Sequence, residues 1–240
     1  MAAPLSSSYR CCRRLAVSSH LLSPSLSPSR LLSSSAVDKP RSGLLQYLRK
    51  RFYDVEALLV WTKQFKKSRL LKKNVYYGYT ESFYGTHVAS AYFILKLKGG
   101  FRFCGQSHWF RANKFNWDFM NHKDCPLEEI DLSYTVINYE GLKNIEEQTS
   151  LRTLSLKACP EVDDWFLSRL HVFQDSLEVL DISHCPRITT GGLAALRNLK
   201  GLKKLNVSSL PGISNPGLLV ILLEEMLPNC DITSDGYEFN

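Results

Sequence analysis

The chain has 240 residues, of which 44% are hydrophobic, and a formal net charge of +7 at pH 7. That length allows one domain, with or without appendages, and a core of ordinary size. No apolar run approaches the roughly 18 to 20 residues that cross a bilayer, which argues against membrane-spanning helices. The seven Cys are scattered and odd in number, so they predict free thiols in a reducing compartment instead of a disulfide framework.

Residues 1 to 37 differ in composition from the rest of the chain. They contain no Asp or Glu but four Arg and twelve Ser, which is typical of a mitochondrial transit peptide. The tetrapeptide Arg30-Leu31-Leu32-Ser33 resembles a matrix-processing site, so we predict a transit peptide at residues 1–32 and a linker at 33–43. A disordered Ser/Pro-rich tail on a cytosolic protein is the alternative. We expect the mature protein in the mitochondrial matrix or on the matrix face of the inner membrane.

Residues 44–126 are predicted to form a basic helical head and an N-terminal cap. Apolar residues recur there every three or four positions, which predicts an amphipathic helix that continues toward Phe65. Between residues 39 and 73 the chain carries eleven Lys or Arg against two acidic residues, a net of +9. The apolar stripe of this helix consists of Leu44, Leu48, Phe52, Val55 and Leu59.

The basic helix has three interpretations. It caps the core, it contacts an inner-membrane leaflet or an acidic partner, or it contacts nucleic acid. No recognisable nucleic-acid-binding fold accompanies it, so we expect no nucleic acid as a partner. The candidate contacts with lipid or an acidic partner are Lys63, Lys66, Lys67, Lys72 and Lys73.

The rest of the head is predicted to cover the apolar end of the first repeat. We expect a helix over about 86–95, a Gly99-Gly100 turn that uses a positive φ, and a strand over 101–104. The aromatic residues that follow are expected to pack in the core, with a partner-binding patch as the alternative. They are Trp109, Phe110, Phe115, Trp117 and Phe119.

From Leu127 the chain repeats itself, with units that begin at Leu127, Leu151, Leu177 and Leu202. Each unit has apolar residues at offsets 0, 3 and 5, which favour a strand, and units two to four also have them at offsets 16 and 19, which favour a helix. In the fourth unit the helix positions are Leu218 and Ile221. A period of about 25 residues indicates a solenoid in which neighbouring units cover each other. We therefore predict an α/β fold, a short leucine-rich-repeat solenoid of about four repeats over residues 127–240.

Two repeats have a Cys-Pro pair where the strand ends, at Cys159 and Cys185, which resembles the Cys-containing subtype of leucine-rich repeat. We expect both thiols to be buried between turns of the solenoid. A metal or redox site is disfavoured because no Cys or His residues have ligand spacing.

Asp163-Asp164 is interpreted as a helix start, and phosphate-binding and nucleophile motifs are absent from the sequence. We expect no catalytic residue, no cofactor and no metal site, and therefore not an enzyme.

The strand residues between the buried leucines are expected to face solvent on the concave side and to bind a protein partner. The convex face and the basic head are equal alternatives, and the sequence leaves the oligomeric state open. The candidate partner-binding residues are Arg152, Ser155, Lys157, Asp181, Ser183, Lys203, Asn206 and Ser208.

Several longer motifs carry a resemblance to a known family. FYDVEALLVW at 52–61, INYEGL at 137–142, VDDWFLSRL at 162–170 and NPGLLVILLEEMLPNC at 215–230 resemble the ATP synthase subunit s family, also called coupling factor B. The resemblance covers nearly all of the chain after the predicted transit peptide at residues 1–32. It implies a non-catalytic mitochondrial assembly factor for the distal membrane arm of respiratory complex I, NADH:ubiquinone oxidoreductase. Its partners would be complex I assembly intermediates and other distal-arm assembly factors, with peripheral contact to the inner membrane.

Two other functions compete with this one. The first is a coupling factor B role beside ATP synthase, which the same family implies. The second is an F-box-type ubiquitin-ligase substrate receptor, because Cys-type repeats often follow an F-box. No F-box opening precedes the repeats here, and a transit peptide would direct the protein away from that machinery.

Overall fold

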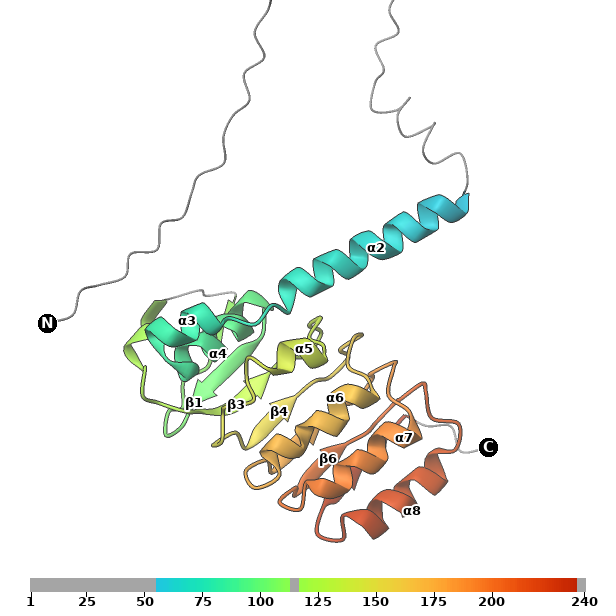
Figure 1. Ribbon diagram of the computed structural model, residues 1–240. Coiled ribbons are helices and arrows are strands. Elements are labelled where there is room, and N and C mark those ends of the chain that lie inside the picture. The colour runs from blue at the N-terminus through green and yellow to red at the C-terminus, as the bar shows by residue number, and fades with distance from the viewer. Residues whose placement is uncertain (1–54, 113–116, 237–240) are drawn as a thin grey trace, which may run out of the picture. The chain divides into compact units, whose positions relative to one another are not determined.

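A computed structural model describes residues 55–112 and 117–236 of the chain (Figure 1). The chain divides into two units, residues 1–50 and 51–240, and every described element lies in the second. The predicted transit peptide, the linker, Leu44, Leu48, Phe52 and Phe115 lie outside the described residues. No helix within the described ranges is both long and apolar enough to cross a membrane.

A seven-stranded sheet with the order β2-β1-β3-β4-β5-β6-β7 organises the described residues. Strands β3 (Leu127–Asp131), β4 (Thr153–Ser155), β5 (Val179–Asp181), β6 (Lys204–Asn206) and β7 (Asp231–Thr233) pair in parallel. Strand β1 (Gly100–Phe103) pairs antiparallel with both β3 and β2 (Phe110–Arg111). Figure 1 shows the repeat helices together on one side of this sheet. The predicted leucine-rich-repeat solenoid is confirmed.

Each repeat returns to the next strand through a short helix. These helices are α5 (Tyr139–Leu142), α6 (Asp164–Arg169) with 3-10 turn η3 (Leu170–Phe173), α7 (Thr190–Leu193) with η4 (Ala194–Asn198), and α8 (Pro216–Met226). The side chains of Asn138, Asp163 and Thr189 cap the first three by accepting from a backbone N–H in the first turn. Asp163 therefore has the structural role predicted for it.

The apolar strand positions form a continuous column across the repeats. Ile130, Leu154, Leu180 and Leu205 are Cα partners from strand to strand, and each is at most 1% exposed. A three-residue strand buries too little surface to be stable alone, so each repeat depends on the apolar face of its neighbour. The strand positions predicted from the sequence are all buried in the four repeats.

The helix of the fourth repeat differs from the prediction. Leu218 and Ile221 were expected in the core, but each is 56% exposed. The reason is the start of α8 at Pro216, one residue later in its repeat than the starts of α6 and α7. This shift rotates the helix, so Leu219 and Leu223 point inward instead and are the buried residues of α8.

The N-terminal cap covers the other end of the solenoid. It contains α3 (Gly78–Tyr84), α4 (Thr86–Lys96) and the 3-10 helix η2 (Trp117–Asn121), and α2 (Val55–Lys73) precedes it in the chain. The predicted helix over 86–95 is confirmed, and Phe93, Phe101 and Phe119 pack fully buried in the same core as the repeats. Core packing was also expected for Trp117, but this side chain is 56% exposed.

The Gly99-Gly100 turn has a different physical basis from the one predicted. The positive φ belongs to Lys98, at 69°, and not to either glycine. Gly99 is needed because a Cβ there would lie 2.7 Å from the backbone oxygen of Asp131. The glycine thus allows the cap to approach β3 closely.

We predict that Leu180→Ala lowers the free energy of unfolding of the whole repeat region by about 2–5 kcal/mol, because Leu180 lies in the middle of the apolar column. Chemical denaturation measures this loss. Val179→Ala, on the other face of the same strand, serves as the matched control and should cost much less. Equal losses from the two variants would show that the strand register is wrong.

Candidate protein interaction site

The end of α2 is tied to the first repeat by one buried side chain, Asn74, which is 2% exposed. Its Nδ2 donates to the carbonyls of Leu70 and Val136 at 3.0 and 2.9 Å, and its Oδ1 accepts from the backbone N–H of Asn138 at 3.1 Å. The amide therefore joins the last turn of α2 to the start of α5. Gly141 is required nearby, because a Cβ at that position would lie 2.2 Å from Asn74 Oδ1.

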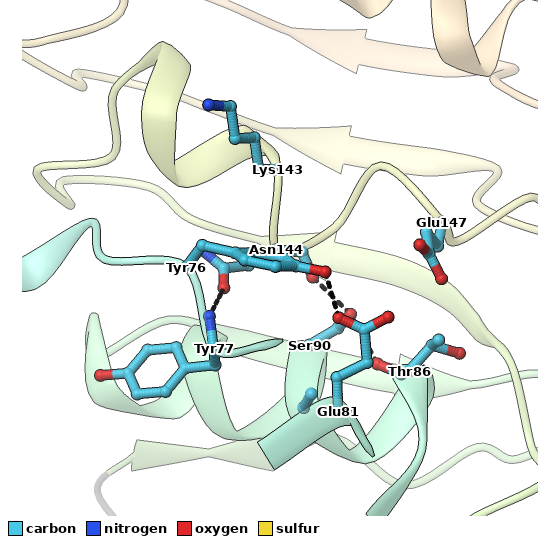
Figure 2. Close-up of a pocket in the computed structure, with 9 residues that line it drawn as sticks. Tyr76, Tyr77, Glu81, Thr86, Ser90, Lys143, Asn144 and Glu147 are labelled. Atoms are coloured by element: carbon cyan, nitrogen blue, oxygen red, sulfur yellow. Dashed lines mark hydrogen bonds between the residues drawn. The ribbon is translucent and has the colours of Figure 1, made fainter. Parts of the chain in front are cut away.

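A second amide, Asn144, fixes the link between α2 and α3 (Figure 2). Its Oδ1 accepts from the backbone N–H of Tyr77 at 2.9 Å, and its Nδ2 donates to the carbonyl of Val75 at 3.3 Å. Beside it, the hydroxyl of Tyr76 donates to Glu81, and this hydrogen bond raises the pKa of Tyr76 to about 12. The crevice between these residues has a volume of about 10 Å³, room for roughly one water molecule, so it is a structural junction and no ligand site.

A larger groove of about 860 Å³ runs between α2 and the loops of the first three repeats. Its basic wall is formed by Lys63, Lys66, Lys67, Arg69 and Lys73. The opposite wall contains Tyr139, Pro160, Glu161, Asp163 and Arg187. Four of the five lysines predicted as a contact site are thus brought together here, whereas Lys72 does not line the groove.

The groove carries an excess of positive charge. Its two carboxylates are already engaged, since Glu161 pairs with Arg187 and Asp163 caps α6. Among the described residues, no ion pair involves Lys63, Lys66 or Lys67. Such a site attracts an anionic ligand, and its affinity would fall as salt is added.

Helix α2 itself does not pack as the capping interpretation expected. None of its described residues is buried, and Val55 and Leu59 of the predicted stripe are 70% and 54% exposed. Leu58, Trp61 and Phe65 follow one another at helical spacing on a face away from the groove lysines, and the rings of Trp61 and Phe65 stack at 5.5 Å. The helix thus has a basic face and an apolar face, which meet at Arg69.

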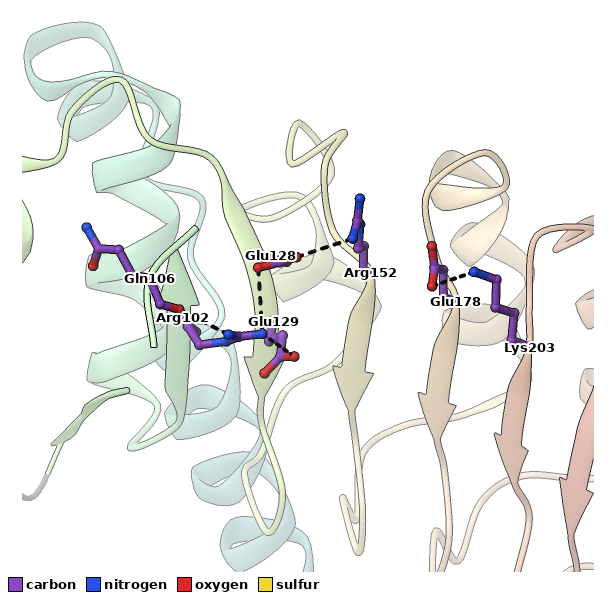
Figure 3. Close-up of polar contacts among 7 residues, drawn as sticks. All are labelled: Arg102, Gln106, Glu128, Glu129, Arg152, Glu178 and Lys203. Atoms are coloured by element: carbon purple, nitrogen blue, oxygen red, sulfur yellow. Dashed lines mark hydrogen bonds and ion pairs between the residues drawn. The ribbon is translucent and has the colours of Figure 1, made fainter. Parts of the chain in front are cut away.

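The open face of the sheet carries ion pairs between repeats (Figure 3). Glu128, Arg152, Glu178 and Lys203 occupy equivalent positions at the start of successive strands and alternate in sign. Arg152 lies 3.5 Å from Glu128, and Lys203 lies 2.9 Å from Glu178, which lowers the pKa of Glu178. Arg102 of β1 extends this pattern to the cap by contacting Glu129 at 2.6 Å. The face is therefore largely neutralised by its own side chains.

Several predicted partner-binding residues serve the fold. The Oδ1 atoms of Asp181 and Asn206 accept from the backbone N–H two residues later, at 2.9 and 3.1 Å, and stabilise the turn after the strand. Asp131 makes the same contact in the first repeat. Burial would raise the pKa of Asp131, but hydrogen bonds from Ser133 and Arg111 outweigh it and hold that pKa below its usual value.

The expected exposure of Ser183 and Ser208 is wrong, because these side chains are only 2% and 8% exposed. Each precedes a residue with positive φ, His184 at 59° and Ser209 at 51°, and this sharp turn encloses the serine. Arg152 and Lys203 remain exposed on the sheet, while Ser155 and Lys157 are partly exposed.

The buried thiols have the structural role predicted for them. Cys159 and Cys185 are 0% exposed, and their Sγ atoms donate to the carbonyls of Leu132 and Leu156 at 3.0 and 3.2 Å. Burial raises the pKa of both thiols, that of Cys185 to about 12, so they stay protonated at neutral pH. No group of three or more metal-ligating side chains occurs in the part of the chain that the structure describes.

Comparison with known proteins agrees with this architecture. A family model described as Leucine Rich repeat matches residues 123–145 and 175–196, which contain β3 with α5 and β5 with α7. The repeats thus have the fold of a short leucine-rich-repeat solenoid. This fold hosts many unrelated functions, so the fold alone does not assign one to the chain.

Two kinds of relative were found. Over 148 residues the chain is 34% identical to Distal membrane arm assembly component 2 of Drosophila melanogaster, which covers 60% of this chain and 52% of that protein. It is 28% and 27% identical to mitochondrial ATP synthase subunit s of Rattus norvegicus and Homo sapiens, over 62% of this chain and 75% of each relative. The chain thus spans about half the length of the Drosophila relative. The resemblance to the subunit s family is confirmed.

We predict that a thiol reagent modifies exposed Cys104 in the native protein while Cys159 and Cys185 react only after unfolding, since attack requires a thiolate. Peptide mapping by mass spectrometry after brief labelling at pH 8 measures each site. Equal labelling of Cys185 and Cys104 in folded protein would contradict the buried, protonated state of Cys185.

Proposed function

We propose that this protein is a non-catalytic mitochondrial assembly factor that helps to build the distal membrane arm of respiratory complex I. The observation that carries this proposal is the similarity to the Drosophila distal membrane arm assembly component, which is higher in identity than the similarity to subunit s of rat or human. The fold supports it, because a solenoid offers extended surfaces to protein partners.

The proposed mechanism is scaffolding by two surfaces of opposite character. The sheet face offers an almost neutral surface on which exposed Arg152 and Lys203, with Lys157 and Ser155 beside them, contact an assembly intermediate. The basic groove offers excess positive charge to an acidic segment of a partner or to anionic lipid. The matrix face of the inner membrane is the place where both kinds of partner meet.

A coupling factor B role beside ATP synthase is the second candidate. One observation favours it, the coverage of 75% of the subunit s sequences in rat and human, against 52% of the assembly component. The two roles differ in which complex depends on the protein, so a single genetic experiment separates them.

We expect loss of the protein to lower mature complex I and to accumulate intermediates without distal membrane-arm subunits, while ATP synthase stays near normal. Native-gel separation of mitochondrial complexes from cells with and without the protein measures both, and re-expression of wild type is the control. Normal complex I together with impaired ATP synthase would instead support the coupling factor role.

We also expect Lys63→Gln/Lys66→Gln/Lys67→Gln/Lys73→Gln to weaken association with the membrane fraction at low salt, because each lysine near an anionic surface contributes about 1 kcal/mol. Re-expressed variants are compared by salt extraction of the membrane fraction and by affinity purification of assembly intermediates. Lys72→Gln/Lys200→Gln changes charge outside the groove and is the control.

Two readouts of this variant assign the anion, the recovery of assembly intermediates by affinity purification and the binding of the purified variant to vesicles of anionic phospholipid. Loss of partner recovery with intact binding to vesicles of anionic phospholipid indicates an acidic protein segment. The reverse result indicates lipid. A variant that matches wild type in both readouts would show that the groove is only a solvated surface.

A further inference from the structure

The C-terminal end of the solenoid exposes an apolar row on α8. Leu218, Ile221 and Leu222 are 56%, 56% and 43% exposed, and their spacing of three and four residues puts them on one face. Strand β7 beside this helix is the edge strand of the sheet, so no later repeat within the described residues covers the row. Terminal repeats of solenoids need a polar outer surface or a cover.

A second apolar row lies on α2, a 19-residue helix with no buried residue. Leu58, Trp61 and Phe65 are 44%, 47% and 49% exposed. Arg69, which also lines the basic groove, follows at the edge of this face, with its guanidinium carbon 5.6 Å from the centre of the Phe65 ring. This row therefore ends in a positive charge.

The two rows match in spacing and in charge. On α8, Glu225 lies three residues after Leu222 and is exposed on the same face. If the two helices run parallel with Trp61 beside Leu218, then Phe65 lies beside Leu222 and Arg69 beside Glu225. Apolar residues spaced three and four apart form the contact between packed helices, and a charged pair beside that contact favours one partner and orientation.

We propose that α2 of one copy of the chain packs on α8 of a second copy, and that the reciprocal contact closes a two-fold dimer. Within one chain this contact is not made, because both rows are exposed. Contact between two α8 helices is disfavoured, since Glu224, Glu225 and Asp231 of both copies would approach each other. A reciprocal contact covers both rows and forms a closed assembly instead of a fibre. The proposal does not depend on the assembly role.

The test is the molecular mass of the purified full chain by light scattering and sedimentation over a range of concentrations. We expect a dimer that dissociates on dilution. Leu222→Asp should leave the chain monomeric, because it places a charge in the apolar contact. Arg69→Glu and Glu225→Arg should each weaken the dimer at least about fivefold, and the double reversal should restore it.

Controls separate this contact from unfolding and from the basic groove. Lys63→Glu reverses a charge on the groove face of the same helix and should leave the dimer unchanged. All substitutions are at exposed positions, so thermal unfolding of the monomer should stay near that of wild type. Wild-type chain that stays monomeric up to about 100 μM would overturn the proposal. The proposal would also be overturned if the Arg69→Glu/Glu225→Arg dimer dissociated more readily than the dimer of either single variant.

Discussion

The structure depends on the column of apolar side chains that runs from strand to strand at equivalent positions. Ile130, Leu154, Leu180 and Leu205 pair in register, and the residues on each side of them pack against the same neighbours. Since no repeat buries its own apolar face, the two ends of the column must be covered from outside. The N-terminal end is covered by the cap through Phe101, which is fully buried. Within residues 117–236, the C-terminal end is covered by α8 and β7, and α8 leaves Leu218, Ile221 and Leu222 exposed there.

Several polar positions recur from repeat to repeat. Residues that recur serve the backbone: Asp181 and Asn206 hold the turn after the strand, and Asp163 and Thr189 cap the helices. The lysines of α2 lie outside the repeats and make no such backbone contact among the described residues. Recurrence therefore identifies polar side chains that the repeats require, whereas a required side chain outside the repeats, such as Asn74, is identified only by its contacts.

How much could be predicted from the sequence depends on how far apart in the chain the contacting residues lie. Strand positions, the cap helix over 86–95 and the buried thiols follow from spacing, because each depends on residues close in the chain. The register of α8 was missed, since the shift caused by Pro216 leaves the leucine spacing nearly unchanged. The groove was also missed, because it depends on Asn74 contacting Val136 and Asn138, more than 60 residues away. The Asn that directly follows the basic helix, Asn74, was the available signal in the sequence.

Ionic strength should affect the basic groove and the apolar rows of α2 and α8 differently, because charge dominates the groove and apolar burial dominates the rows. Residues 55–73 carry six basic side chains and one acidic side chain, whereas residues 74–240 carry fifteen basic and twenty acidic ones. Many charged side chains of the repeats form internal ion pairs, and the repeats are acidic on balance, so the uncompensated positive charge is concentrated on α2. Contacts of the groove should therefore weaken as ionic strength rises, while the apolar rows of α2 and α8 are held by burial, which salt does not screen. A helix with both faces can bind an anionic partner and an apolar one at the same time, because the two faces point in different directions.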